Sequence, residues 1–274
     1  MTSDAILRLD RVCKAFGGAT IVDNLSLVVR RGSRTALIGP NGAGKTTVFN
    51  LISGLFDVDA GRIFSLERDI TAIPSRARIH HGIARTFQNV RLMKQLTTLE
   101  NVLLGQHVRN DGWRGALQPV NLMARNRWRE EARAALSDAG LGAYERSFAG
   151  ALPYGVQRRV ELVRALMARP TLLLLDEPAA GLNAGETEEL QLHLLRLCRQ
   201  GDLTLLVVEH DMHFVGALCE VAIVLSFGRK IAEGTPRAVR ENADVQEVYL
   251  GRSAKPIASP SNALTEHCVA ACRA

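Results

Sequence analysis

One short stretch limits the possible folds of this chain more than any other, the run GPNGAGKT at residues 39–46. It follows the short apolar run RTALI and precedes a segment with helical spacing, from Lys45 to Gly54. Glycines in such a loop let backbone amides curl around phosphate oxygens, and the start of the following helix adds the positive end of its dipole. The stretch therefore predicts a strand–loop–helix unit that binds a nucleotide.

Individual residues of this loop have distinct expected roles. Lys45 would bridge the β- and γ-phosphates, and Thr46 would ligate Mg²⁺. At ordinary glycine usage, a chance match to the pattern is expected on the order of once in a hundred such chains. The other residues expected to contact the nucleotide are Gly39, Pro40, Asn41, Gly42, Ala43, Gly44 and Thr47.

A second apolar run supplies acidic groups. In the run TLLLLDEP, at residues 171–178, apolar and polar residues do not alternate, which is typical of parallel strands buried on both faces. The apolar part is followed by Asp176 and Glu177. Asp176 suits the Mg²⁺ shell, and Glu177 suits the polarisation of an attacking water. The alternative is that the two acids cap the next helix.

Two further polar residues follow predicted strands. His210 comes after the apolar run LTLLVV, where it could contact the γ-phosphate; an ordinary surface histidine is the alternative. Gln88 ends the predicted strand GIARTF, where its amide could reach Mg²⁺ and the attacking water. The candidate catalytic residues are Lys45, Gln88, Glu177 and His210, and the candidate Mg²⁺ ligands are Thr46, Gln88 and Asp176.

The segment LPYGVQRRVELVRALMARP, at residues 152–170, is predicted to be a helix with an uncovered start. Pro153 suits a first helical turn, and apolar residues then recur at the spacing of a buried stripe. No Ser, Asp or Asn caps this start. We expect the free amides of Tyr154, Gly155 and Val156 to face ATP held by another copy, because phosphoryl transfer needs donors on every side of the γ-phosphate.

The order of the elements predicts an α/β fold with a parallel sheet, an antiparallel β subdomain and a helical subdomain. The first thirty residues read as strands, and residues 221–234 read as a hairpin. We expect one ATP-binding domain over residues 5–251, with the helical subdomain at about 90–165. Residues 252–274 are small and polar, and we expect a mostly disordered tail there.

Composition sets further limits. The chain has 274 residues, of which 47% are hydrophobic, and this content is enough to fill a core. Its net charge of +6 favours a mixed-charge surface over one that binds nucleic acid. Five cysteines without a Cys-x-x-Cys pair, and no signal-like N-terminal stretch, favour a reducing cytoplasm. No apolar run approaches the ~18 residues that span a bilayer, so any membrane role is expected to be peripheral.

These motifs, in this order, resemble the ATP-binding subunits of ABC transporters. The resemblance implies that two subunits, identical or related, sandwich two ATPs head to tail at the cytoplasmic face of the inner membrane. It implies that Phe16 stacks on adenine and that the run AAGLN, residues 179–183, crosses the dimer interface. The implied partners are integral-membrane permease subunits and, indirectly, a periplasmic or extracellular solute-binding protein, with no nucleic acid.

The finer pattern is similar to the branched-chain amino acid import branch, on the runs RTFQNVRLM, YGVQRRVELVRAL, DEPAAGLN and VEHDM. This resemblance implies an ATPase that powers the uptake of branched-chain or other hydrophobic amino acids. Urea and short-amide importers have a similar pattern. A soluble non-transport ABC ATPase and an inactive scaffold cassette are further alternatives.

Two positions depart from the superfamily pattern. Pro153 stands where a serine hydroxyl usually reaches the γ-phosphate, and Val156 stands where a glutamine or an acid is usual. Only backbone amides and the helix dipole remain at this start. We expect ATP-driven dimerisation to be weaker than in relatives that carry Ser and Gln.

Overall fold

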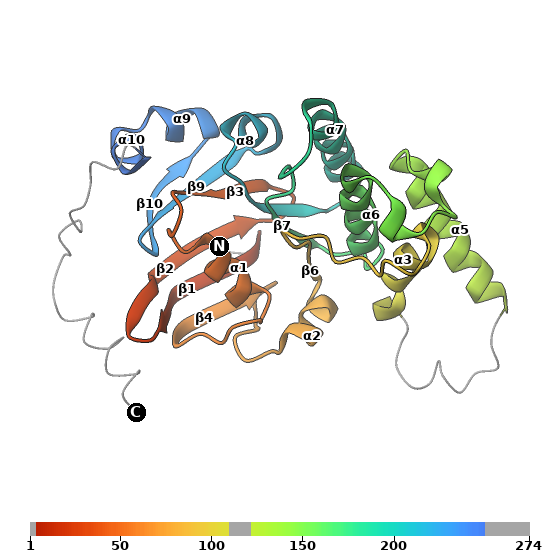
Figure 1. The fold of residues 1–274 in the computed structure, drawn as a ribbon. Coiled ribbons are helices and arrows are strands. Elements are labelled where there is room, and N and C mark those ends of the chain that lie inside the picture. The colour runs from red at the N-terminus through yellow and green to blue at the C-terminus, as the bar shows by residue number, and fades with distance from the viewer. Residues whose placement is uncertain (1–3, 110–121, 250–274) are drawn as a thin grey trace.

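The computed structural model describes residues 4–109 and 122–249, and its strands form two sheets (Figure 1). A four-stranded sheet has the order β2-β1-β4-β5, and a six-stranded sheet has the order β10-β9-β3-β8-β7-β6. The strands are β1 (Ala5–Phe16), β2 (Ala19–Arg30), β3 (Arg34–Ile38), β4 (Ala60–Ser65), β5 (Arg68–Asp69), β6 (Ile83–Arg85), β7 (Leu172–Asp176), β8 (Thr204–Val208), β9 (Val221–Ser226) and β10 (Arg229–Gly234).

The two sheets differ in strand direction. The described pairs of the four-stranded sheet are antiparallel. In the six-stranded sheet, β6, β7, β8, β3 and β9 run parallel, and β10 pairs antiparallel with β9. Because the carboxyl ends of parallel strands lie along one edge, residues that follow β3, β7 and β8 are brought together there.

Helices lie between the sheets and on the outer face of the six-stranded sheet (Figure 1). They are α1 (Lys45–Ile52), α2 (Ser75–Arg78), α3 (Thr98–Leu104), α5 (Leu122–Asp138), α6 (Tyr154–Leu166), α7 (Ala184–Gln200), α8 (Met212–Leu218), α9 (Pro236–Glu241) and α10 (Ala243–Tyr249). Within the described ranges, no helix is long and apolar enough to cross a membrane.

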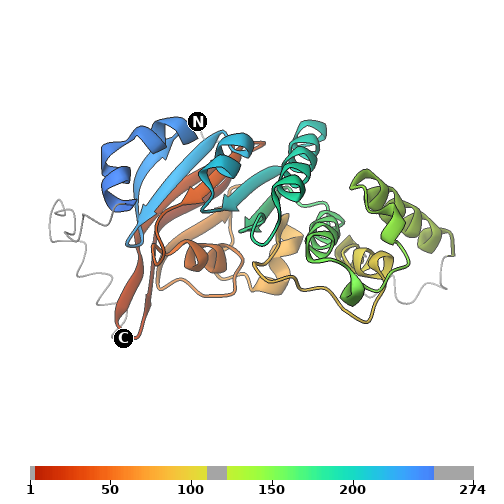
Figure 2. The ribbon, with the colours of Figure 1, turned by 45° about the horizontal axis from the view of Figure 1, so that its top comes forward.

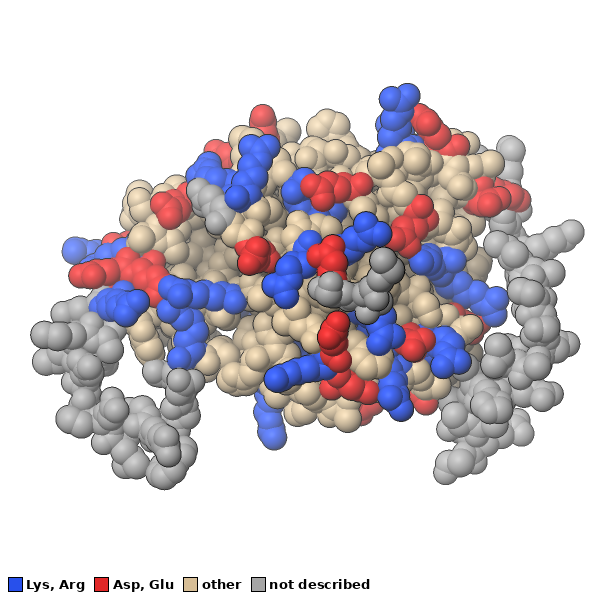
Figure 3. All heavy atoms as spheres, turned by 180° about the vertical axis from the view of Figure 1, so that it is seen from behind, with Lys and Arg blue, Asp and Glu red and all other residues tan. Residues whose placement is uncertain are grey.

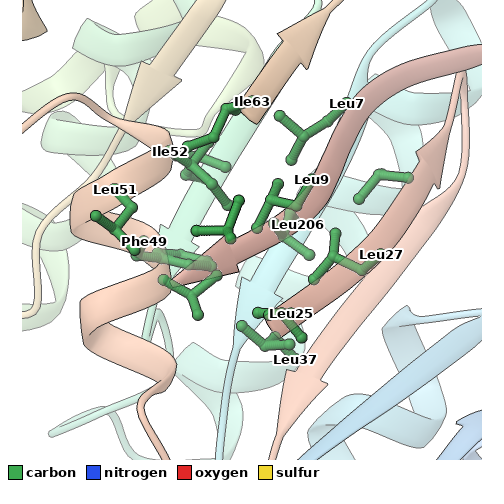
Figure 4. Packing of buried hydrophobic residues seen from close by; sticks show 14 of the residues in the cluster. Leu7, Leu9, Leu25, Leu27, Leu37, Phe49, Leu51, Ile52, Ile63 and Leu206 are labelled. Carbon is green, nitrogen blue, oxygen red and sulfur yellow. The ribbon is translucent and has the colours of Figure 1, made fainter. Parts of the chain in front are cut away.

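The strand β7 shows how the six-stranded sheet is covered on both faces. Leu172 and Leu174 belong to a cluster with α1 and the four-stranded sheet, whereas Leu173 and Leu175 belong to a cluster with α6, α7 and α8. Successive side chains of a strand point to opposite faces, so a run without alternation is buried on both. Figure 4 shows the first cluster, in which Phe49 of α1 lies among leucines of both sheets.

A third cluster joins α3, α5 and α6 at one end of the molecule (Figure 2). Val102 of α3, Leu136 of α5 and Val160 of α6 are fully buried in it. The predicted stripe of α6 faces this cluster, with Val163 and Met167 buried and Val156 partly buried. These helices form the part of the fold that the sequence predicts as the helical subdomain.

The parallel sheet, the antiparallel sheet and the helices agree with the predicted fold class, but three local expectations are wrong. Pro153 precedes α6 instead of opening it, because its ψ of 150° is extended and its carbonyl accepts the first helical bond, from Gln157. The strand β6 ends at Arg85, three residues before Gln88, because only Thr86 continues the pairing, to Leu174.

The third error concerns the first two strands. The apolar runs AILRLDRV and NLSLVV, at residues 5–12 and 24–29, predict two shorter strands with a turn-like segment between them, whereas β1 ends at Phe16 and β2 begins at Ala19. Phe16 pairs with Ala19, so β1 and β2 meet at the two-residue turn of Gly17 and Gly18. Both glycines have positive φ, at 55° and 84°, as tight hairpin turns require.

Basic and acidic side chains are interspersed on the face seen in Figure 3, as expected for a mixed-charge surface. The predicted tail at 252–274 lies outside the described residues, as does most of the run RNDGWRGALQP, residues 109–119, whose sequence is typical of a loop.

Candidate nucleotide-binding site

The loop at residues 39–44 (the P-loop) follows β3, and its glycines have left-handed backbones. The φ angles are 149° at Gly39, 79° at Gly42 and 98° at Gly44. A Cβ on Gly39 would lie 2.2 Å from the carbonyl oxygen of Leu225, so the close approach of β9 requires glycine there. The helix α1 begins at Lys45 with no side-chain cap and no acid in its first turn, which leaves its first amides available to an anion.

Lys45 lies in the P-loop region, near the two acids at the end of β7. Its Nζ donates to the carbonyl oxygens of Gly39, at 2.7 Å, and Pro40, at 3.0 Å. Burial lowers the pKa of Lys45, whereas the nearby charges of Glu177 and Asp176 raise it. The ammonium group therefore lies within electrostatic reach of both carboxylates. Of the other loop and helix-start residues, Ala43 and Gly44 are buried, Thr47 is half-buried, and Asn41, Gly42 and Thr46 are exposed.

The structure brings Glu177, Gln88 and His210 together. The Oε2 of Glu177 accepts a hydrogen bond from Nε2 of Gln88 at 2.8 Å, and its Oε1 lies 2.6 Å from Nε2 of His210. The side chain of Glu177 is 18% exposed, so solvent reaches it. A carboxylate held in one orientation beside a phosphate-binding loop can orient an attacking water and take its proton.

Asp176 pairs with Arg85, a residue that sequence reasoning missed. Nη2 of Arg85 lies 2.7 Å from Oδ2 of Asp176. The other nitrogen, Nη1, donates to Asn50 Oδ1 at 2.7 Å and to Ser53 Oγ at 2.9 Å, near the end of α1. The candidate Mg²⁺ ligand is thus anchored to the helix that follows the P-loop.

Glu209, also missed from the sequence, connects two segments beside Glu177. Its Oε1 accepts from the amide of Ala179 at 2.9 Å, and its Oε2 accepts from the amide of His210 at 3.0 Å. Burial raises the pKa of Glu209, although these amide donors oppose the shift. The signal was an acid directly after a continuous apolar run. Arg158, which is buried in α6, was also missed, and no apolar run precedes it.

The start of α6 (residues 154–156, the α6 start) contacts α7 and the segment before it. It has no side-chain cap and no acid in its first turn. A Cβ on Gly155 would lie 2.2 Å from Oε1 of Glu186, and one on Gly181 would lie 2.9 Å from the Tyr154 ring. In the described residues, no hydrogen bond joins the α6 start to the P-loop of the same chain. The carboxylate of Glu186, which lies near the α6 start, interacts favourably with the positive end of the helix dipole.

Phe16, the expected adenine platform, lies at the end of β1. Its side chain is partly exposed and makes an edge-to-face contact with Phe56, with 5.2 Å between ring centroids. Nζ of Lys14 lies 5.2 Å from the Phe16 centroid, and Lys14 is itself fixed by Asp59 at 2.7 Å. The ring thus has a defined position and a free surface.

Comparison with known protein families gives two matches. The ABC transporter family model matches residues 22–180, which include the P-loop, the α6 start and the end of β7. A second model, described as branched-chain amino acid ATP-binding cassette transporter, matches residues 229–255.

Curated relatives cover nearly the whole chain. The branched-chain amino acid transport ATP-binding protein BraF of Pseudomonas aeruginosa is 38% identical over 92% of this chain and 100% of its own length. LivG of Escherichia coli, described as a high-affinity branched-chain amino acid transport ATP-binding protein, is 37% identical over the same shares. The lipopolysaccharide export ATP-binding protein LptB of Escherichia coli is 33% identical over 90% of this chain and 98% of its length.

A solved structure agrees with these relatives. The ADP conformation of MJ1267, an ATP-binding cassette of an ABC transporter, superposes with a TM-score of 0.78 at 33% identity. The match covers 90% of this chain and 99% of that one. This chain therefore belongs to the ABC transporter family of ATP-binding cassettes, and it is an ATPase of that family.

Proposed function

We propose that this chain powers an importer of branched-chain or other hydrophobic amino acids, as a peripheral subunit at the cytoplasmic face of the membrane. The carboxylate of Glu177, held between Gln88 and His210 within reach of Lys45, carries the hydrolytic part of this proposal. The solute class is supported by the names of the relatives and by the second family match, at residues 229–255.

ATP would bind through the amides of the P-loop, with adenine on Phe16 and the phosphates beside Lys45. In the described structure Lys45 donates to two loop carbonyls, so it would exchange these partners for phosphate oxygens. Glu177 would orient the attacking water and His210 would hold the γ-phosphate.

The residues present fit Mg²⁺, because Thr46, Asp176 and Gln88 offer the hard oxygen donors that it prefers. Arg85 occupies Oδ2 of Asp176, which leaves Oδ1 for the ion or for one of its waters. A small number of protein ligands suits Mg²⁺, which keeps several waters and phosphate oxygens. When bound, the ion would neutralise charge on the β- and γ-phosphates.

A second ATPase subunit, identical or related, would complete the site from across a head-to-tail dimer. The α6 start is uncapped, and Glu186 and Gly181 lie beside it. In the dimer, a γ-phosphate held by the partner would be the anion that its free amides bind. The segment at 179–183 would then lie at the dimer interface.

The permease would dock in a groove of about 640 Å³ between the ATP-binding core and the helices α3 and α6. Arg78 and Arg85 line it, and among the described residues Arg78 Nη1 and Arg85 Nε are buried without a hydrogen-bond partner. Arg76 and His107 also line the groove and are exposed, and such groups favour a partner that offers acceptors, such as a carboxylate or the carbonyls of a helix end. Phe87 also lines the groove, so an occupant would press on the residue next to Gln88.

The test is affinity purification of the tagged chain from detergent-solubilised membranes, followed by ATPase assays of the complex in lipid. We expect a multi-span permease and an ATPase subunit to survive a salt wash, and leucine-loaded binding protein to stimulate hydrolysis. If only urea or short amides stimulated hydrolysis, the solute would be urea or a short amide and not a branched-chain amino acid. Hydrolysis with only soluble partners would favour a non-transport ATPase, and no phosphate release with any partner would favour an inactive scaffold.

A further inference from the structure

Arg158 lies one turn into α6, and its side chain is buried, with 4% exposed. Its guanidinium bonds to main-chain carbonyls from two segments of the candidate site. Nη2 donates to the carbonyl of Glu177 at 2.6 Å and to that of Asp176 at 3.4 Å, and Nη1 contacts the carbonyl of Phe87. Arg158 therefore fastens α6 to the end of β7 and to the residue before Gln88.

A second set of bonds fastens the same helix to the segment that follows Gln88. Oε1 of Glu161 accepts from the amide of Arg91 at 3.0 Å, and Arg164 Nη1 donates to the Arg91 carbonyl at 2.6 Å. Oε2 of Glu161 lies 3.5 Å from Arg158 Nη1, so this carboxylate also orients Arg158. The helix thus contacts the chain on both sides of Gln88.

Burying a charged side chain such as Arg158 costs free energy of folding. A buried cation loses its hydration, and apolar residues of similar volume often replace buried ion pairs without loss of stability. Here the guanidinium donates charge-assisted hydrogen bonds to carbonyls that include that of Glu177, whose backbone has a positive φ of 47°. Arg158 therefore contacts the backbone whose conformation directs the Glu177 side chain.

We propose that Arg158 is a positioning residue that holds Glu177, which acts in one ATP site, at a fixed place relative to the α6 start, which completes the other ATP site. Arg158 lies four residues after Tyr154, which is about one helical turn. One turn of helix moves as a nearly rigid unit, so a displacement of Arg158 also displaces the α6 start. A shift at either site is then passed to the other through one side chain. This role rests on the head-to-tail dimer proposed above.

The test uses dimers of two separately tagged copies of the full chain, assembled with ATP, in which Glu177→Gln silences one of the two sites. In the first arrangement, Arg158→Lys is placed in the copy that keeps Glu177. In the second, it is placed in the silenced copy, which contributes only its α6 start to the working site. Lysine keeps the charge but lacks the planar fork that reaches several carbonyls.

We expect turnover to fall by up to about 10²-fold in both arrangements, the size of effect that a displacement of about 1 Å produces. ATP binding to each separate copy should stay unchanged, because the P-loop is intact. The matched control is Arg159→Lys. Arg159 is the next residue of α6, but it bonds to Glu189, at 2.6 Å, and to the carbonyl of Ala139, so turnover should be retained.

A loss confined to the first arrangement would overturn the proposal, because Arg158 would then serve only the Glu177 of its own chain. Retained turnover in both arrangements would overturn it as well. If the Arg158→Lys copy does not fold, Glu161→Gln takes its place and must give a smaller loss in both arrangements. If the pair with intact Arg158 forms no ATP-dependent dimer, two identical copies do not form the head-to-tail dimer, and the role of Arg158 in such a pair fails with it.

Discussion

Nη2 of Arg85 lies 2.7 Å from Oδ2 of Asp176, and both side chains are only 7% exposed. This buried pair connects the edge strand β6 with the strand β7. The Arg85 guanidinium also lies 5.1 Å from the centroid of the Phe87 ring. The candidate metal ligand therefore has a cationic partner of its own, and that partner also lines the groove proposed for the permease.

Replacing Arg85 with methionine should destabilise the chain by about 3–5 kcal/mol, because it leaves a buried carboxylate without a partner. The measurement is urea unfolding without nucleotide. The matched control is Arg62→Met, since Arg62 pairs with Asp69 at 3.9 Å on the exposed surface and should contribute about 1 kcal/mol or less. Mg²⁺ and ATP should stabilise Arg85→Met more than the parent, because the ion supplies the lost positive charge. Equal stabilisation of both would count against a metal site at Asp176.

Part of the candidate site could be predicted because its residues lie at or just after strand ends. Asp176, Glu177 and His210 each come at or just after the end of an apolar run that reads as a buried strand, and a parallel sheet collects such residues at one edge. The glycine pattern of the P-loop adds its own local rule, since it needs positive φ angles. Local signals were therefore enough for these residues.

The partners of these residues could not be predicted in the same way. Arg85 meets Asp176 across 91 positions of sequence, and Arg158 meets Phe87 across 71. Periodicity shows that a position is buried, but not which carbonyl or carboxylate it faces. Arg158 stands between Gln157 and Arg159, outside the apolar stripe of α6, so nothing local distinguishes it from an exposed charge.

Replacing Glu177 with glutamine should lower ATP hydrolysis by about 10²–10⁴-fold, because an amide cannot take a proton from the attacking water. ATP binding should persist, since it depends on the P-loop. Phosphate release and binding of a fluorescent ATP analogue measure the two effects separately. The control is Glu188→Gln, an exposed glutamate of α7. Normal turnover in Glu177→Gln would remove Glu177 from its proposed role.

Restoring the usual side chains at the α6 start should strengthen ATP-driven dimerisation. In Pro153→Ser with Val156→Gln, two polar groups are added where the structure has no side-chain cap. We expect a gain of about 1 kcal/mol, equivalent to about fivefold in the dissociation constant of the dimer. Sedimentation with ATP in a Glu177→Gln background measures it. Pro153→Ala with Val156→Ala controls for the loss of proline, and an unchanged dissociation constant in the Ser/Gln variant would refute the expectation.

Glu161 should make the stability of the chain depend on pH in an unusual direction. Burial raises its native pKa, although the amide of Arg91 and the charges of Arg158 and Arg164 oppose the shift. Between the ordinary pKa of glutamate, about 4.3, and the raised value, the native state binds more protons than the unfolded state. The contribution of Glu161 to the free energy of unfolding therefore falls as pH rises through this window.

The difference in unfolding free energy between the parent and Glu161→Gln isolates this contribution, and it should decrease from acid toward neutral pH in urea titrations. Glu131 supplies a control of opposite sign. Burial alone would raise the pKa of Glu131, but hydrogen bonds from Arg109 and Arg169 lower it. Its stabilisation is therefore present above the ordinary glutamate pKa and is lost as pH falls, so the difference between the parent and Glu131→Gln should increase with pH. If the Glu161 difference also increased with pH, Glu161 would not be a buried carboxylate with a raised pKa.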